Sequence, residues 1–550
     1  MSTKKLLITA LLAAAGLARA QLDVQPVPAL PQASALPVDW QHGVFMEIFV
    51  RGYQDSDGDG IGDLRGLIRR LDYLKKLGVS GLWLMPITAS SDHDHGYATT
   101  DYRRIEPQYG TLEDFDTLIR EAHKRGIGIV MDYVINHASW EFPAFQAALR
   151  DRDGPWRNWF VWNPDPGPGW DIWGKYPWYD ATTQPWTWQG EWKDMPAPRP
   201  GSPDVYFGTF GPQMPDFNLR NPAVVRYHED SLRFWLNRGL DGYRLDAAPH
   251  LIENNARDWN DQPESRALTK HFQDLIKSYP GRYVVCEATA KPIDYGAPEL
   301  CGGAFAFNLH ADMMAAAKGE AEAVQRVADY YRSMSPTMAT FLHNHDIFTG
   351  QRVWDQLHGD EARYRLAAAS YLLLPGTPFV YYGEEIGLAG IDGKTPRDDA
   401  PLRAPMSWTP ANEGPDGFST SLEPYRPLSL NRSRHNAESQ QRDPDSLFNF
   451  YRRLIALRRA LPSLTLGRYE ADQVVGQAWS FQRVHGRERS LVVINYGDRP
   501  AQLRVQGLPS RARGRAAYPQ QAATLKADAS GQAAVTLPPL SLRVYRIEAP

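Results

Sequence analysis

The sequence is poor in cysteine, nearly balanced in charge, and has one long hydrophobic run, at its N-terminus. Two of the 550 residues are cysteine, so disulfide bonds cannot define the fold of so long a chain. Lys and Arg number 60 against 64 Asp and Glu, a net charge of -4. This balance excludes partners selected by bulk charge, such as nucleic acid or an anionic membrane surface.

The hydrophobic run has the three parts of a secretory signal peptide. The basic segment MSTKK precedes LLITALLAAAGLA, and Ala18-Arg19-Ala20 offers a small-residue cleavage site. The run falls short of the ~20 apolar residues that span a bilayer. We therefore expect residues 1–20 to be a cleaved signal peptide, and the mature protein to be periplasmic or secreted, without a membrane partner.

The two cysteines, Cys286 and Cys301, lie close together in the sequence. In an oxidising compartment they could close a small loop beside Glu287. The alternative is two separate buried thiols, because a disulfide also needs a geometry that the sequence does not show.

Strand and helix patterns alternate through most of the chain, and this alternation predicts a parallel sheet. Eight apolar strands are expected, starting near residues 45, 80, 127, 241, 282, 303, 338 and 378. Leucines at helical spacing between Leu64 and Leu77, followed by Gly78, show one of the intervening helices. Eight such units predict a closed (β/α)8 TIM barrel, formed by residues 41–137 and 216–462.

Three further segments depart from this pattern. Residues 21–40 are rich in proline and are expected to be an extended leader. Residues 138–215 should form a domain B inserted after the third strand, since compact domains rarely tolerate so long a structureless loop. Nine of the 17 tryptophans lie between Trp156 and Trp192, and we expect most to be core and two or three to line a cleft. Residues 463–550 alternate in hydrophobicity and predict an antiparallel β-sandwich domain.

Three carboxylates end short apolar runs, in DGYRLD, RYVVCE and ATFLHNHD. They are Asp246, Glu287 and Asp346. Active sites of parallel barrels are built at the C-terminal ends of the strands. Cleavage of a glycosidic bond needs one carboxylate to attack or stabilise the anomeric carbon and a second, protonated, to donate to the leaving oxygen. Arg244, two residues before Asp246, would keep that carboxylate ionised and oriented.

Four segments occur in the order found in the α-amylase family, glycoside hydrolase family 13, which the chain resembles. They are DYVINH (132–137), GYRLDAAPH (242–250), CEAT (286–289) and FLHNHD (341–346). The resemblance extends through GVFMEIFVR (43–51), MPDFN (214–218) and GTPFVYYGEEIG (376–387), and so covers nearly everything after the leader.

The resemblance implies a role for each matching residue. Asp246 would be the nucleophile, oriented by Arg244, and Glu287 the acid/base. Asp346 would stabilise the transition state. Contacts to the sugar in the central subsite are implied for Asp132, Tyr97, His137 and His345. The family retains anomeric configuration, which agrees with a covalent glycosyl intermediate on Asp246.

A metal site is predicted in DSDGDGIGD (55–63), whose alternating acids match the early part of an EF-hand loop. Gly66 replaces the Glu of that motif, so the loop is not an EF-hand. We expect the loop to bind a structural cation, Ca2+ as the first choice and Mg2+ as the second. The expected ligands are Asp55, Asp57, Asp59, Asp63 and the Ile61 carbonyl. The alternative is a polar turn that only starts a helix. Asn136 and the His250 carbonyl match ligands of another calcium in many α-amylases, but Pro249 departs from that pattern, and the sequence leaves this second site open.

Ala98 bears on the substrate. Family members that remove single glucose units usually have GYD where this chain has Gly96-Tyr97-Ala98, and that Asp grips the terminal sugar. Its loss favours an α-amylase that hydrolyses α-1,4 bonds in starch-type glucans and maltooligosaccharides. We expect the enzyme to be a monomer. The alternatives are a trehalose synthase or other α-glucosyl transferase, an α-glucosidase on short oligosaccharides and, more remotely, a non-catalytic binding relative.

Overall fold

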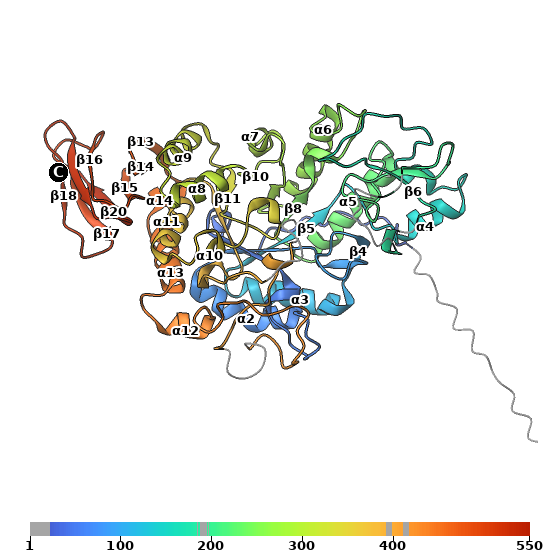
Figure 1. Cartoon of the computed structure of the whole chain (residues 1–550), viewed down its shortest axis with the longest axis horizontal. Helices are drawn as coiled ribbons and strands as arrows, with labels where there is room; N and C mark the ends of the chain where they lie inside the picture. Colours follow the sequence, from blue (N-terminus) through green and yellow to red (C-terminus); the bar gives the residue numbers. More distant parts are fainter. Residues whose placement is uncertain are drawn as a thin grey trace, which may run out of the picture.

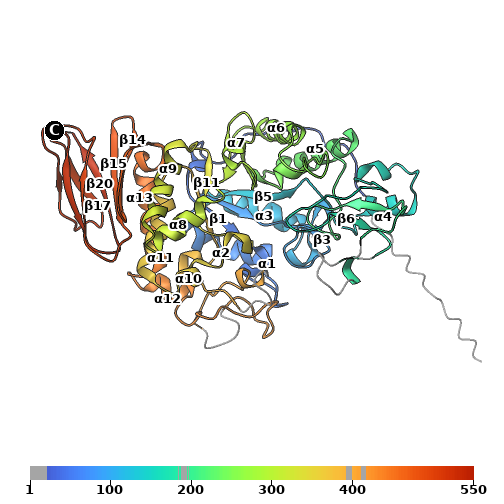
Figure 2. The ribbon, with the colours of Figure 1, turned by 45° about the horizontal axis from the view of Figure 1, so that its top comes forward.

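The structure is a computed structural model that describes residues 22–183, 185–187, 195, 197–391, 399–410 and 417–549. The expected signal peptide and Gln21 lie outside the described residues. Three parts follow one another along the long axis: the C-terminal sheets, the barrel and the inserted domain (Figure 1). The same order is visible after a turn of 45° (Figure 2).

The expected parallel strands close into an eight-stranded barrel, which confirms the predicted fold class. The strands are β1 (Phe45–Ile48), β2 (Gly81–Leu84), β5 (Gly128–Val134), β8 (Gly242–Asp246), β9 (Tyr283–Cys286), β10 (Ala304–Phe305), β11 (Met338–Thr340) and β12 (Thr377–Tyr381). The hydrogen-bonded order is β1-β12-β11-β10-β9-β8-β5-β2. The ring closes because Phe45 pairs with Phe379 on one side and with Gly81 on the other.

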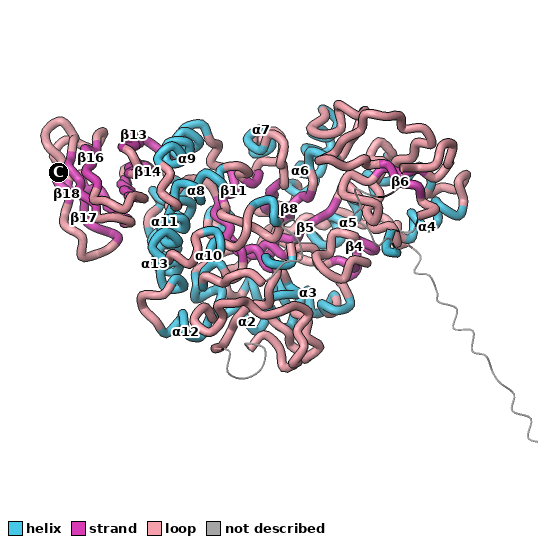
Figure 3. Tube along the Cα trace, in the orientation of Figure 1, coloured by secondary structure: helices cyan, strands magenta, loops and turns pink. Residues whose placement is uncertain are grey.

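Helices surround this barrel (Figure 3). The longer ones are α2 (Leu64–Leu77), α3 (Leu112–His123), α5 (Pro222–Asn237), α6 (Pro263–Lys277), α8 (Leu309–Ala317), α9 (Ala321–Ser333), α11 (Glu361–Leu372) and α13 (Leu447–Ala460). In α2 the Asp63 carboxylate caps the start by accepting the Gly66 N–H, and Gly78, with φ of 102°, ends the helix. No helix in the described part of the chain is long and apolar enough to cross a bilayer.

Shorter elements connect these units. They are α1 (Val50–Tyr53), α4 (Pro143–Arg150), α7 (Pro292–Gly296), α10 (Val353–Gln356), α12 (Ala437–Arg442), α14 (Pro462–Leu466) and the β-hairpin of β3 (Thr88–Ser90) with β4 (Thr99–Ile105). Cys286, the last residue of β9, is joined to Cys301 by a disulfide with Cα atoms 6.2 Å apart. The bond braces the strand that precedes Glu287.

Aromatic side chains fill the barrel interior at the N-terminal ends of the strands, which we call the lower end. The upper end is formed by the C-terminal ends of the strands. Phe45 lies 4.9 Å, between ring centroids, from both Tyr283 and Phe379. Trp83 lies above them, 5.0 Å from Phe305. These rings are buried in one cluster, so the interior of the barrel is a packed core.

The inserted domain is mostly irregular (Figure 3). His137 and Asp216 form an antiparallel bridge, so the chain leaves the barrel and returns to it side by side. Strands β6 (Trp178–Asp180) and β7 (Val205–Phe207) pair antiparallel. Their core consists of Ile172, Trp178, Val205 and Phe207. Trp188 and Trp192 lie outside the described residues.

The C-terminal part forms two antiparallel sheets on a shared core, as the alternating pattern predicts. The six-stranded sheet contains β13 (Arg468–Val475), β14 (Ala478–His485), β15 (Glu488–Asn495), β20 (Ser541–Glu548), β17 (Arg513–Tyr518) and β18 (Leu525–Lys526), and the second pairs β16 (Ala501–Val505) with β19 (Ala533–Leu537). Leu491, Leu503 and Val535 belong to the core between them. Arg483 donates to the Leu373 carbonyl at 3.1 Å and so ties the six-stranded sheet to the barrel.

Candidate active site

The three predicted acids lie beyond or at the C-terminal ends of barrel strands. Asp246 is the last residue of β8, and Glu287 directly follows β9. Asp346 is farther from its strand than the sequence indicates: β11 ends at Thr340, and Asp346 directly precedes the short helix Ile347–Thr349. Strand register thus places two acids, and the loop after β11 places the third.

The Arg244 guanidinium joins three carboxylates. Its Nη1 donates to Asp132 Oδ1 at 2.9 Å and also to Asp246 Oδ1, while its Nη2 lies 3.1 Å from Glu287 Oε2. Arg244 and Asp132 are register partners on adjacent strands, and the arginine is 1% exposed. One buried cation therefore holds the carboxylates from three neighbouring strands at fixed positions.

Asp132 and Asp246 share a low-dielectric environment in which acidity depends on burial and on charge. Burial raises the pKa of Asp132 to about 6, against the opposing effect of Arg244. Burial also raises the pKa of Asp246, and Arg244 again opposes it, while Glu287 adds like-charge repulsion. Three carboxyls facing one guanidinium favour retention of a proton within the group.

Tyr97, His345 and Glu47 form a second line of contacts. The Tyr97 hydroxyl donates to Asp132 Oδ2 at 2.9 Å and lies 2.9 Å from His345 Nε2. The two rings are stacked with centroids 5.6 Å apart. His345 Nδ1 lies 2.5 Å from Glu47 Oε1.

Burial shifts the acidity of both members of the Glu47–His345 pair. Burial, and next the Asp346 charge, raises the pKa of Glu47 well above its usual range. Burial lowers the pKa of His345, which favours the neutral ring. The His345 Nε2 faces the Tyr97 oxygen and lies 3.3 Å from Asp346 Oδ2.

Asp346 is more exposed than the three carboxylates around Arg244, with 22% of its side chain accessible to solvent. Burial, followed by the charges of Asp399 and Glu287, raises its pKa to about 8. The Arg403 guanidinium lies 3.8 Å from Asp346 Oδ1 and 3.2 Å from Asp399 Oδ2. Arg403 also lies 3.1 Å from Asp94 Oδ2.

His137 is at the edge of this network. Its ring is near the Tyr97 backbone, and burial lowers its pKa to about 3, so it is neutral. Its buried Nε2 has no hydrogen-bond partner in the described structure. A buried ring nitrogen of this kind is suited to a ligand hydroxyl. The structure thus brings all eight predicted substrate and catalytic residues to one end of the barrel.

Four contributors were missed by the sequence analysis: Glu47, Trp83, Asp399 and Arg403. Glu47 gave a signal, because an acid within the buried run FMEI requires a partner. Trp83 donates its indole N–H to Asp132 at 3.2 Å, and its polar atom is invisible in an apolar strand pattern. Arg403 and Asp399 come from the long segment after β12, where no periodic pattern singles out a residue.

The predicted metal loop gathers carboxylates. Oxygen atoms of Asp55, Asp57 and Asp63 lie within 4.8 Å of one another, the one such metal-type group found among the described residues. Asp59 lies outside that group and accepts the Ile61 N–H at 2.8 Å. Burial and the charges of the other three acids raise the pKa of Asp59. Carboxylate oxygens gathered in this way are the hard ligands that fit a cation such as Ca2+.

Asn136 and His250, which match ligands of a second calcium, have different environments. The Asn136 side-chain amide donates to Asp216 Oδ2 at 3.0 Å, and the His250 ring stacks on Trp259 at 5.5 Å. Asn136 Oδ1 and His250 Nδ1 are nevertheless buried without a hydrogen-bond partner among the described residues. The second calcium site therefore stays open, as it was in the sequence analysis.

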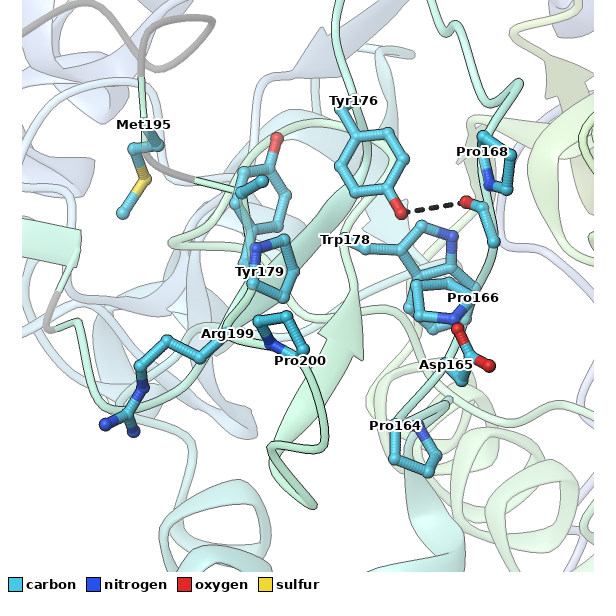
Figure 4. A pocket seen from close by; sticks show the side chains of 13 residues that line it. Pro164, Asp165, Pro166, Pro168, Tyr176, Trp178, Tyr179, Met195, Arg199 and Pro200 are labelled. Atoms are coloured by element: carbon cyan, nitrogen blue, oxygen red, sulfur yellow. Dashed lines mark hydrogen bonds between the residues drawn. The ribbon is translucent and has the colours of Figure 1, made fainter.

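A pocket of about 460 Å³ in the inserted domain is separate from this network. Pro164, Tyr176, Trp178 and Pro200 are among its lining residues, and Tyr176 donates to the Gly167 carbonyl at 3.0 Å (Figure 4). None of the acids of the barrel lines it. Concavity alone therefore does not locate the chemistry, whereas the titratable groups do.

Comparison with known proteins agrees with this geometry. Residues 47–467 match the family described as alpha amylase, catalytic domain. The chain belongs to the α-amylase family. It is therefore an enzyme of a family that hydrolyses or transfers glucosyl units, and its substrate is an oligosaccharide or glucan.

Several members of the α-amylase family are similar over most of their length. The trehalose synthase/amylase of Mycobacterium tuberculosis is 34% identical over 487 residues, 80% of this chain and 78% of that protein. Alpha-amylase 3 of Dictyoglomus thermophilum is 32% identical over 471 residues, 83% of this chain and 85% of that protein. The solved structure of the α-amylase from H. orenii matches with a TM-score of 0.74 at 30% identity, over 92% of this chain and 100% of that one.

Proposed function

We propose that this protein is a retaining glycoside hydrolase that cleaves α-1,4 bonds of starch-type glucans and maltooligosaccharides. The observation that carries the proposal is the single Arg244 guanidinium in contact with Asp246, Glu287 and Asp132. Two carboxyls fixed around one cation provide the nucleophile and the proton donor that a retaining reaction requires.

In the proposed reaction, the Asp246 carboxylate attacks the anomeric carbon while Glu287 donates its proton to the leaving oxygen. The bond to the leaving sugar breaks, and a glycosyl ester forms on Asp246. Glu287, now ionised, removes a proton from water, which attacks the same carbon and releases the sugar with its original configuration. Arg244 stabilises whichever carboxylate carries the charge.

Asp346 and the His345 Nε2 would bind hydroxyl groups of the sugar in the central subsite. Their contacts to each other and to Tyr97 hold them in place before substrate arrives. Groups positioned in advance stabilise the distorted, positively charged sugar without reorganisation at the moment of reaction. The neutral His137 ring is placed to accept or donate one further hydrogen bond.

Product analysis tests this proposal. Starch, maltohexaose, maltose and pullulan are incubated with the protein and with Asp246→Asn, and the products are separated by chromatography. We expect maltooligosaccharides from starch and maltohexaose, first released as α-anomers by NMR, and no turnover by the variant. Initial release of β-anomers, or no turnover of any glucan, would reject the proposal.

A second candidate, trehalose synthase, is favoured by a specific observation. Three proteins named trehalose synthase or trehalose synthase/amylase are 31–34% identical to this chain. That reaction shares the first step. In its second step the released glucose stays in the site and attacks in place of water. Trehalose from maltose, as the main product of the same incubation, would select it over the hydrolase.

We further propose that the Asp55–Asp63 loop binds Ca2+ in a structural role, with Asp55, Asp57, Asp59, Asp63 and the Ile61 carbonyl as ligands. The ion would hold the loop that precedes α2. A ligand present at 100 times its Kd stabilises by about 2.7 kcal/mol, so removal by EDTA should lower Tm and Ca2+ should restore it. An equal Tm in EDTA and in Ca2+ would reject the site. Asp57→Asn should weaken the Ca2+ response.

Finally, we propose that the enzyme works outside the cytoplasm, either in the periplasm or secreted. The disulfide between Cys286 and Cys301 supports an oxidising compartment. Mass spectrometry of the exported protein should show an N-terminus at Gln21. Retention of the full chain inside the cell would oppose this.

A further inference from the structure

The residue that follows the proposed nucleophile has an unusual backbone conformation. Ala247 has φ of 50° and ψ of 33°, in the left-handed region. A residue with a Cβ atom is strained there, and glycine is the residue that adopts this conformation readily. Ala247 is 1% exposed, so it does not belong to a loose surface turn. Strain of this kind is retained mainly at functional sites, where the surrounding structure enforces it.

The left-handed residue turns the chain sharply as it leaves the barrel. Strand β8 ends at Asp246, and a short helical turn, Ala248–His250, begins directly after Ala247. The His250 N–H donates to the Ala247 carbonyl at 2.8 Å. The N–H of Ala247 donates to a side chain, the Glu287 carboxyl, with 3.1 Å between the nitrogen and Oε2.

Two further hydrogen bonds hold the main chain of Glu287 against the same segment. The Glu287 N–H donates to the Leu245 carbonyl at 2.9 Å, and the Ala248 N–H donates to the Glu287 carbonyl at 3.1 Å. Of these three contacts, the one from Ala247 is the contact that reaches the carboxyl group. The proposed nucleophile and the proposed acid are therefore joined through the peptide unit between Asp246 and Ala247.

The contacts of Glu287 distinguish its two carboxyl oxygens. Oε2 accepts the Ala247 N–H and also lies 3.1 Å from Arg244 Nη2. In the part of the chain that the structure describes, no donor bonds to Oε1. Two N–H donors on Oε2 occupy both lone pairs of that oxygen, which leaves Oε1 as the place for a proton.

We propose that the Ala247 N–H, together with Arg244, directs the Glu287 proton to Oε1 and stabilises the carboxylate that forms when this proton leaves. The proposal rests on the proposed glycoside hydrolase function and deepens it. As Asp246 bonds to the anomeric carbon, the bond to the leaving oxygen breaks, and that oxygen takes the Oε1 proton. One negative charge thereby passes from Asp246 to Glu287.

Both donors on Oε2 become more effective during this step. A hydrogen bond to an ionised acceptor is roughly twice as strong as one to a neutral acceptor, so contacts to Oε2 stabilise the transition state more than the bound substrate. Arg244 also contacts Asp246, and it loses there part of what it gains at Glu287. The Ala247 N–H has Glu287 alone as its partner. Its strained backbone fixes it before substrate arrives, so no reorganisation is needed.

The test removes this N–H and keeps the side chain. Lactic acid in place of Ala247, introduced into the full chain by nonsense suppression, retains the methyl group and replaces the N–H by an ester oxygen. Maltohexaose needs a proton on its leaving oxygen, whereas α-glucosyl fluoride releases a fluoride ion without one. We expect kcat/KM to fall about tenfold for maltohexaose, a change of about 1.4 kcal/mol, and at most about twofold for α-glucosyl fluoride.

The ratio of the two kcat/KM values separates this hydrogen bond from general damage. Both substrates are measured on one protein sample, so a lower folded fraction cancels in the ratio. The same ester at Ala248 is the matched control, because it removes the N–H that donates to the Glu287 backbone carbonyl, and it should leave the ratio unchanged. Ala247→Gly keeps the N–H and adopts φ of 50° without strain. It should also leave the ratio unchanged, with Tm no lower than that of the parent protein.

Equal losses on the two substrates, or no loss on maltohexaose, in the Ala247 ester would overturn the proposal. A change of the same size in the ratio for the Ala248 ester or for Ala247→Gly would overturn it as well. Failure of the proposed hydrolase function would look different, because the parent protein itself would then turn over no maltohexaose.

Discussion

The two ends of the barrel interior are built from the same strands but contain opposite chemistry. The lower end is filled by Phe45, Tyr283 and Phe379, which contact one another through ring faces and edges. The upper end holds Arg244 among three carboxylates. Trp83 separates them, with its ring toward Phe305 and its N–H toward Asp132.

The difference shows that the beginning and the end of a barrel strand serve different purposes. Residues early in a strand lie where nothing but packing is required, and aromatic volume fills the space. Residues at or after the strand end lie where loops and solvent reach, and charge becomes useful there. The apolar floor also lowers the local dielectric, which strengthens the interactions of the charged groups above it.

Removal of the central cation should have the largest effect on this arrangement. Arg244→Gln leaves Asp132, Asp246 and Glu287 buried without a counter-charge, so we expect about 3–5 kcal/mol less stability. Activity should fall at least about 100-fold, since the acids lose their common support. Denaturant unfolding and kcat/KM on maltohexaose measure both. Arg332→Gln, which breaks an exposed pair with Asp472, is the control and should cost under about 1 kcal/mol.

Truncation at the lower end should affect stability without affecting chemistry. Phe45→Ala removes a fully buried ring and is expected to cost about 3–5 kcal/mol. In the fraction that stays folded, kcat should remain within a few-fold of the parent value, because Phe45 belongs to the apolar cluster at the lower end. A loss of kcat as large as that of Arg244→Gln would show that the two ends are not separable.

The charged end should also make stability depend on pH. The pKa of Asp346 rises from 3.8 to about 8 in the folded protein, so between these values the folded state binds a proton that the unfolded state has released. This group therefore destabilises the protein progressively as pH rises from about 4 to 8. Asp346→Asn removes that penalty and should raise Tm at pH 8 more than at pH 5, although activity is lost. Parallel Tm–pH curves for the two proteins would contradict this.

The smallest expected effect is at the boundary between the ends. Trp83→Phe keeps a ring on the floor but deletes the hydrogen bond to Asp132, at a cost of about 1 kcal/mol. Since Tyr97 and Arg244 still hold Asp132, activity should fall only a few-fold. A fall in kcat greater than that of Phe45→Ala would mean that the Trp83 hydrogen bond is needed for catalysis as well as for stability.

Most of the fold was predictable because its signals are local. Runs of apolar residues and the leucine spacing of α2 depend on neighbours along the chain, and every predicted barrel strand is present. Asp246 and Glu287 were also accessible, since a strand end can be read from the sequence. Asp346 was placed less accurately, because its position depends on the loop after β11.

Contacts between distant segments were not predictable in the same way. Glu47 and His345 are 298 positions apart, and no pattern within either segment names the other. Trp173 is one of many tryptophans in the inserted domain, and the sequence does not single it out. Its positive φ and its contact with the His250 ring are visible only in the folded structure. The same holds for Arg403, whose partners Asp94 and Asp346 come from two distant segments.

The sequence by itself determined the eight-stranded barrel, the family and the set of acids at the strand ends, because periodicity and short motifs encode them. The tertiary structure decided which groups share the charge, through one arginine inserted among three carboxylates. Electrostatic coupling and ring contacts act through space over a few ångströms, and the chain brings such neighbours together only when it has folded.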